Sequence, residues 1–156
     1  MLIGVPRETA PGETRVAVTP ETAKKLKAQG NTVESGAGLA ASVTDAAYAS
    51  VGAEIVDRAA ALGSELVLKV RSPNAEELTL MKSGTALVGM LNPFDRPGLE
   101  ALAAAGLTSF ALEAAPRTTR AQSMDVLSSQ ANIAGYKAVM IAADRYQRFF
   151  PMLMTA

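Results

Sequence analysis

Short apolar runs rich in β-branched residues recur along the chain, and stretches with the spacing of amphipathic helices separate them. Runs of this length and composition are typical of buried strands. The expected strands cover residues 2–5, 31–34, 53–56, 65–70, 85–91 and 107–112. Strands that alternate with helices form parallel sheets with helices packed on their faces. The pattern therefore predicts an α/β fold with a mostly parallel sheet.

Capping residues mark the expected ends of the helices. Thr19 can serve as the N-cap of a helix that has Pro20 at its first position, and Gly30 follows the end of that helix. Three further helices are expected to begin at Thr44, at Ser72 or Asn74, and at Asp95, and to end near Gly52, Met81 and Gly106. Together these helices complete a Rossmann-like or flavodoxin-like domain of three layers.

The last helix differs from the others in its length. Across residues 133–150 the apolar side chains recur at spacings of three and four residues, which predicts one long helix with one apolar face. Pro151 is expected to end it. The pattern indicates a domain of residues 1–132 followed by a connecting helix, residues 133–156, with a domain boundary at the end of the sequence.

Composition narrows the chemistry that the chain can perform. It has no Cys and no His, so it lacks a thiolate nucleophile, a zinc-thiolate site, and the usual general base near neutral pH. Any chemistry must use other side chains or a cofactor, and no metal site is expected. Fifteen basic residues balance fifteen acidic ones without a basic stripe, which argues against nucleic acid as a partner.

Targeting and membrane segments are also not expected. The start of the chain leads directly into a strand-like run, without the regions of a signal peptide. No apolar run reaches the roughly 18–20 residues that are needed to span a bilayer. These observations predict a soluble chain that is not exported.

The most informative stretch is residues 117–136, RTTRAQSMDVLSSQANIAGY, because many hydrogen-bonding side chains follow the last expected strand. Arg117 can pair with a phosphate or polarise an amide oxygen, and Gln122 and Ser128 can orient a ribose or a carboxamide. Asp125 can accept a hydrogen bond from a hydroxyl or an amide. The stretch is therefore interpreted as a ligand-binding loop. The alternative is a capped polar loop in which Ser123 caps a helix and Asp125 lies in its first turn.

A glycine-rich sequence at residues 36–41, GAGLAA, matches the pattern G-x-G-x-x-A, and Asp57 follows at about the distance expected in a dinucleotide-binding fingerprint. A pyrophosphate, however, needs a helix that begins directly at the glycines. Here the next helix is expected to begin several residues later, after Thr44. A tight turn that glycine permits is the favoured interpretation.

Three basic residues are further candidates for binding. Arg15 can form a bidentate pair with a ligand carboxylate or phosphate, or it can bridge Glu13 and Glu21 at the surface. Lys69 and Arg71 alternate at the end of an expected strand, so their side chains should point to opposite faces of the sheet. One of the two is a candidate to line a cleft at the carboxyl ends of the strands.

Several motifs resemble a known family along nearly the whole chain. The sequences GVPRE (4–8), ETRVAVTP (13–20), ESGAG (34–38) and LKV (68–70) are similar to an amino-terminal domain shared by alanine dehydrogenase and proton-translocating NAD(P) transhydrogenase. The sequences PRTTRAQSMD (116–125), LSS (127–129) and ANIAGY (131–136) resemble the alpha subunit of the transhydrogenase alone. The second set favours the transhydrogenase branch.

This resemblance implies a function as the NAD(H)-binding component of the transhydrogenase, in which hydride passes between NAD(H) and NADP(H) and proton translocation is coupled to the transfer. The implied cofactor-binding residues are Arg117, Thr118, Thr119, Arg120, Gln122, Asp125 and Ser128, with Gln122 and Asp125 as the catalytic ones. The implied partners are the membrane component and the component that carries NADP(H), and the subunit is expected to form a homodimer. The implied location is cytoplasmic, peripheral to the inner membrane.

Departures from the family pattern limit what this chain alone is expected to do. Alanine dehydrogenase has a second Lys where this chain has Arg71, and a His in the segment that aligns with residues 91–93, where this chain has Asn92. In the family a Rossmann domain that binds NAD follows Ala156, so the chain by itself is expected to be inactive. The alternatives are an NAD-dependent oxidoreductase like alanine dehydrogenase, and a truncated, non-catalytic binding module.

Overall fold

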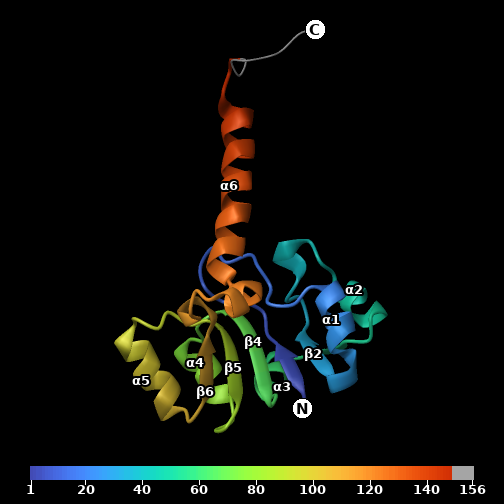
Figure 1. Cartoon of the computed structure of the whole chain (residues 1–156). Helices are drawn as coiled ribbons and strands as arrows, with labels where there is room; N and C mark the ends of the chain where they lie inside the picture. Colours follow the sequence, from blue (N-terminus) through green and yellow to red (C-terminus); the bar gives the residue numbers. More distant parts are fainter. Residues whose placement is uncertain (149–156) are drawn as a thin grey trace. The chain divides into compact units, whose positions relative to one another are not determined.

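The computed structural model describes residues 1–148, which fall into two compact units, Met1–Ala115 and a second unit that begins at Pro116. The first unit holds a parallel sheet of six strands in the order β3-β2-β1-β4-β5-β6 (Figure 1). The strands are β1 (Ile3–Val5), β2 (Asn31–Glu34), β3 (Glu54–Val56), β4 (Leu66–Arg71), β5 (Ala86–Met90) and β6 (Thr108–Ala111). All the expected strands are present, and the α/β prediction is confirmed.

Five α-helices connect these strands. They are α1 (Pro20–Leu26), α2 (Asp45–Ser50), α3 (Arg58–Leu62), α4 (Ala75–Leu80) and α5 (Arg96–Ala104), with short 3₁₀ segments at η1 (Lys27–Gln29), η2 (Leu39–Ala41) and η3 (Leu112–Ala114). The chain winds from β1 to β3 in one direction and from β4 to β6 in the other. Because crossovers between parallel strands are right-handed, the helices of the two halves lie on opposite faces of the sheet.

The capping predictions are largely confirmed. Thr19 and Thr44 accept hydrogen bonds from the backbone N–H groups of α1 and α2. Of the two candidates for α4, Asn74 is the cap, and it forms a reciprocal capping box with Glu77. Asp95 precedes α5 as expected, but its side chain makes no capping hydrogen bond.

Helix α3 was not expected from the sequence. Its N-cap is Asp57, whose carboxylate accepts a hydrogen bond from the backbone N–H of Ala60 at 2.8 Å. The sequence pattern had suggested Asp57 as the acidic residue of a dinucleotide fingerprint. A helix of five residues carries too little apolar periodicity to be recognised, so only the cap could have indicated it.

Two apolar clusters form the core of the first unit. One gathers around β1 and β2 and contains Val5, Val33 and Tyr48, whose hydroxyl donates a hydrogen bond to the carbonyl oxygen of Val18 at 2.6 Å. The other gathers around β4 and β5 and contains Val67 and Leu87. The clusters support the two halves of the sheet, and the carboxyl ends of the strands meet at one edge.

The second unit consists of the 3₁₀ segment η4 (Thr119–Met124) and the helix α6 (Val126–Arg145). The predicted start of this helix at residue 133 was wrong, because Asp125 caps the helix and it begins earlier. Its predicted end was also late, since α6 ends at Arg145. Phe150 and Pro151, which the prediction placed at that end, lie outside the described residues.

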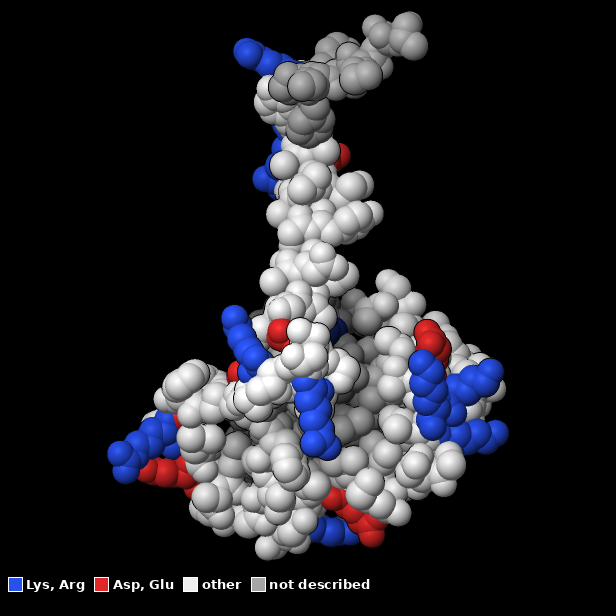
Figure 2. Space-filling view, viewed as in Figure 1, with Lys and Arg blue, Asp and Glu red and all other residues white. Residues whose placement is uncertain are grey.

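The surface of α6 differs from the single apolar face that was expected. Along its length α6 carries few charges (Figure 2). Tyr136 and Met140 are exposed, but Val139 and Ile141, which point in other directions, are exposed as well. The apolar side chains are thus spread around the helix. No helix among residues 1–148 is both long and apolar enough to cross a membrane. The proposed division at residue 132 stays a prediction.

Candidate functional site

The polar segment of residues 117–128 is built from η4 and the first turn of α6. The side chains of Arg117, Thr118, Thr119, Arg120 and Gln122 are all exposed. Within residues 1–148 they form no hydrogen bond, so their donors and acceptors are open to solvent. Guanidinium, hydroxyl and amide groups at such spacing suit a ligand that carries phosphates, hydroxyls and a carboxamide.

Asp125 and Ser128 have a defined structural role. The carboxylate of Asp125 accepts one hydrogen bond from the backbone N–H of Ser128 at 3.0 Å and another from the Ser128 hydroxyl at 2.6 Å. These bonds hold the pKa of the Asp125 carboxyl below its usual range, with the Ser128 hydroxyl as the largest cause and Arg117 as a minor one. The predicted cap at Ser123 was wrong, since Ser123 lies within η4 and Asp125 is the N-cap of α6.

The alternative interpretation of the segment as a capped loop is therefore correct for two residues. Capping explains the positions of Asp125 and Ser128, while the other five polar side chains named above make no contribution to it. A carboxylate that caps a helix still has free lone pairs, so capping and ligand binding are compatible. The assignment of residues 117–128 to cofactor binding stays a prediction.

A second group of charges lies at the carboxyl edge of the sheet in the first unit. Glu13 accepts a hydrogen bond from Arg15 Nε at 2.7 Å and one from Arg71 Nε at 2.9 Å. Hydrogen bonds from the Arg15 guanidinium are the main cause that lowers the pKa of Glu13 from 4.5 to about 2. The predicted bridge from Arg15 to Glu13 is confirmed. Glu21 pairs with Lys25 instead of Arg15.

Lys69 is buried, and it does not line a cleft. Its ammonium group lies 3.0 Å from Glu77 and 3.4 Å from Glu8, and all three side chains are almost fully buried. Arg71 has 53% of its side chain exposed. Of the two basic residues that alternate at the end of β4, Arg71 is thus the one that faces solvent.

The glycine-rich sequence at residues 36–41 forms a turn, as its favoured interpretation predicted. The backbone N–H of Gly36 donates a hydrogen bond to Asp45 at 2.8 Å, and the hydroxyl of Ser35 donates another to the same carboxylate at 2.7 Å. Gly36 has φ of 77°, which favours glycine. Because an internal carboxylate takes the N–H of Gly36, this turn does not offer the phosphate cradle of a dinucleotide fingerprint.

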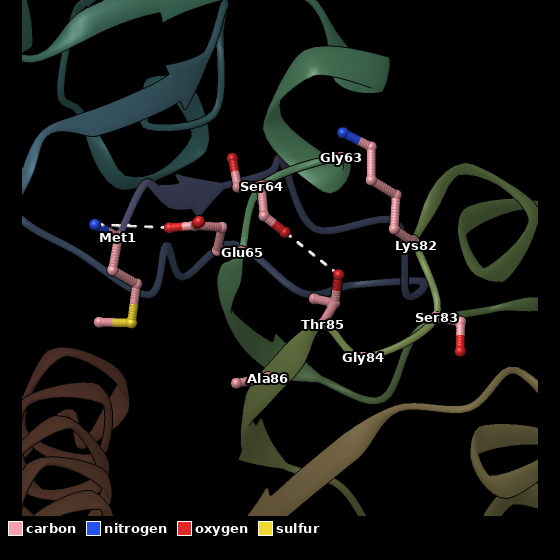
Figure 3. Close-up of a pocket in the computed structure, with 9 residues that line it drawn as sticks. All are labelled: Met1, Gly63, Ser64, Glu65, Lys82, Ser83, Gly84, Thr85 and Ala86. Carbon is pink, nitrogen blue, oxygen red and sulfur yellow. Dashed lines mark hydrogen bonds and ion pairs between the residues drawn. The ribbon is translucent and has the colours of Figure 1, made fainter.

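A hollow of about 630 Å³ lies at the opposite end of the sheet, before the starts of β4 and β5. Figure 3 shows Glu65 directed toward the amino group of Met1, and Thr85 bonded to Ser64. These polar groups connect neighbouring strands to each other. Ligands of open parallel sheets lie at the carboxyl ends of the strands, so the hollow is not a candidate for the main site. Among residues 1–148 there is also no group of acidic side chains that could hold a metal ion.

Comparison with known proteins decides the family. Residues 4–134 match the model of the alanine dehydrogenase/PNT N-terminal domain. The chain belongs to this family. It is 46% identical to the first of the parts that form NAD(P) transhydrogenase subunit alpha in Rhodospirillum rubrum, over all of this chain and 43% of that protein. It is 35% identical to alanine dehydrogenase of Bacillus subtilis, over 92% of this chain and 38% of the dehydrogenase.

The fold of the alanine dehydrogenase/PNT N-terminal domain agrees with these sequence matches. The crystal structure of the transhydrogenase from Sinorhizobium meliloti superposes with a TM-score of 0.93 at 45% identity, over all of this chain and 48% of that one. This chain therefore spans less than half the length of these relatives. The resemblance to the transhydrogenase branch is confirmed.

Asn92 is where the resemblance implies that alanine dehydrogenase has a His. It has φ of 52°, in the left-handed region that Asn tolerates better than most residues. Its backbone N–H donates a hydrogen bond to Glu113 at 2.7 Å. An amide side chain cannot accept and release a proton near neutral pH, so Asn92 is unsuited to the acid-base role of a His.

Proposed function

We propose that this chain is the amino-terminal part of the NAD(H)-binding component of a proton-translocating NAD(P) transhydrogenase. The observation that carries the proposal is the match to a transhydrogenase alpha subunit along the whole chain, at 46% identity against 35% for alanine dehydrogenase. Residues 117–128 contribute to this preference, because they carry the motif that distinguishes the transhydrogenase branch in the sequence.

The proposed cofactor contacts use the open polar groups of η4 and the start of α6. Arg117 and Arg120 supply guanidinium groups for phosphate or carboxamide oxygen atoms, and Thr118, Thr119 and Ser128 supply hydroxyl groups. Gln122 and Asp125 are proposed to orient the carboxamide and the ribose beside the reacting ring. The nicotinamide itself supplies the hydride chemistry, and the protein contributes orientation and exclusion of water.

The proposed partners follow from the relatives. The alpha subunit of Rhodospirillum rubrum is named as one of several parts, which points to an assembly with further subunits. We place NADP(H) on such a partner, with proton translocation in a separate membrane component. We also propose that the NAD(H)-binding component is a homodimer on the cytoplasmic side of the inner membrane.

A chimera tests the proposal directly. This sequence replaces the matching 43% of the Rhodospirillum rubrum subunit, whose remainder supplies the rest of the NAD(H)-binding component. With the partner components added, the chimera is expected to transfer hydride from NADPH to an NAD analogue. Replacing Arg117 with Ala should lower kcat by roughly 10²–10⁴-fold, the range associated with lost orientation or lost stabilisation of the reacting groups.

Controls separate cofactor binding from folding. Arg96→Ala removes an exposed guanidinium of α5 and should leave turnover unchanged. Asp125→Ser keeps an oxygen that can cap α6 but removes the carboxylate. Lost turnover with a fully formed helix would support a role for the carboxylate, whereas wild-type turnover in Arg117→Ala and Asp125→Ser would refute the proposed site.

A further inference from the structure

The sheet has one topological switch point, between β1 and β4, where the chain changes its winding direction. Open α/β sheets commonly bind their ligands there, beyond the carboxyl ends of the two strands. Strand β1 ends at Val5, and Pro6 has no backbone N–H to continue the ladder. Strand β4 pairs with β1 only at Leu66 and Val67 and then runs on to Arg71. The final part of β4 is therefore free of a strand on that side.

A carboxylate of the chain itself occupies this place. Glu8 Oε1 accepts a hydrogen bond from the N–H of Val70 at 2.6 Å, and Glu8 Oε2 accepts one from the N–H of Arg71 at 3.2 Å. In a regular strand, successive N–H groups point to opposite sides. The register of β4 shifts between Leu68 and Arg71, and this irregularity lets two successive groups reach one carboxylate.

Buried charges fix the carboxylate from below. Lys69 Nζ lies 3.4 Å from Glu8 and 3.0 Å from Glu77, and the exposed fractions of these three side chains are 0%, 2% and 1%. Glu77 is held in turn by the capping box of α4. Two backbone amides and an ammonium group around one carboxylate make up the donor set of a typical anion site.

We propose that Glu8 is an internal anion that fills the ligand crevice of this sheet, so that NAD(H) is excluded from the switch point and Arg71 is held in position beside Glu13. This inference deepens the proposed function and rests on it for the identity of the excluded cofactor. It also accounts for a family member whose sheet has Rossmann-like order while its proposed cofactor contacts lie elsewhere, in residues 117–128. Glu8 acts through Arg71 and is a positioning residue.

Chemical rescue tests the inference on the whole 156-residue chain. In Glu8→Ala the two amides and Lys69 lose their anion, and acetate is small enough to replace it. Hydrogen exchange at the Val70 and Arg71 amides should become at least about tenfold faster in the variant, as expected for the loss of a charge-assisted hydrogen bond. Acetate should restore the protection saturably, and chloride at equal ionic strength should not.

Glu21→Ala is the matched control, because Glu21 is an exposed carboxylate that pairs only with Lys25 among the ion pairs of residues 1–148. It should change neither amide and should show no response to acetate. If Glu8→Ala does not fold, Glu8→Gln keeps the shape with one carbonyl acceptor, and acetate should then raise the melting temperature of Glu8→Ala but not of Glu8→Gln.

Two outcomes would overturn the inference. One is unchanged exchange at Val70 and Arg71 in the folded Glu8→Ala variant. The other is saturable binding of inorganic phosphate or acetate at these amides in the wild-type chain, which would mean that the crevice is open. Neither outcome depends on turnover, so a failure here is distinct from a failure of the transhydrogenase assignment.

Discussion

The carboxyl edge of the sheet and the segment of residues 117–128 are both rich in polar side chains, but they use them differently. At the edge, Glu8, Glu13 and Glu34 each bond to backbone amides or to cations of the chain. In the segment, the side chains of Arg117 and Gln122 are exposed and make no hydrogen bond within the described residues.

This contrast separates architecture from binding. A polar group whose hydrogen-bonding capacity is met internally has a structural reason to be there. An exposed group without internal partners has no such reason, and a cluster of them in one short segment favours a ligand. The edge is thus the foundation of the domain, and residues 117–128 are its proposed binding surface.

The largest expected effect comes from removing Lys69. Lys69→Ala leaves Glu8 and Glu77 as buried carboxylates without their shared cation, which should destabilise the fold by about 3–5 kcal/mol. Urea unfolding followed by circular dichroism measures the loss. Lys25→Ala, which removes an exposed i,i+4 pair, should change the free energy of unfolding by less than about 0.5 kcal/mol. Equal effects of the two variants would erase the distinction.

Much of this architecture could be predicted from the sequence, since the strands are short apolar runs and the main helices begin at recognisable caps. Helix α3 was missed because it is too short to show a helical period. The start of α6 was missed because the first turn of the helix is polar, so Asp125 was assigned to the loop instead of the cap.

The charge network could not be predicted in the same way. Glu8 and Val70 are 62 positions apart in the sequence, and their bond depends on the register shift in β4. Local spacing contains no information about such a contact. The alternation of Lys69 and Arg71 correctly indicated opposite faces, but the partners that bury Lys69 come from two other segments of the chain.

The next effect concerns the packing beneath the edge. A Cβ on Gly4 would overlap the carbonyl oxygen of Ala61, so Gly4→Ala should cost about 1–3 kcal/mol of stability. Gly135→Ala in α6 is the matched control, because no atom lies within 4 Å of its Cβ. There the better helix propensity of Ala should stabilise by about 0.5–1 kcal/mol. Thermal unfolding of both variants tests the opposite signs.

A smaller effect is expected from acid. The pKa of Glu13 is lowered from 4.5 to about 2 mainly by Arg15, so its ionised form stabilises the fold above pH 4.5 and this contribution is lost as the pH falls toward 2. The effect should be smaller than that of Lys69→Ala, because 36% of Arg15 and 53% of Arg71 are exposed to water. Glu13→Gln should flatten the decline of urea midpoints across this range. An unchanged slope would contradict the pairing.

The smallest effect on stability is expected in residues 117–128. Arg117→Ala and Gln122→Ala remove exposed side chains without hydrogen bonds in the described structure, so each should change the free energy of unfolding by less than about 0.5 kcal/mol. The same substitutions in the chimera should lower hydride transfer. A loss of stability comparable to that of Lys69→Ala would show that these side chains support the fold, and the contrast between the two regions would then fail. Retained stability together with lost turnover is the result that only a binding surface produces.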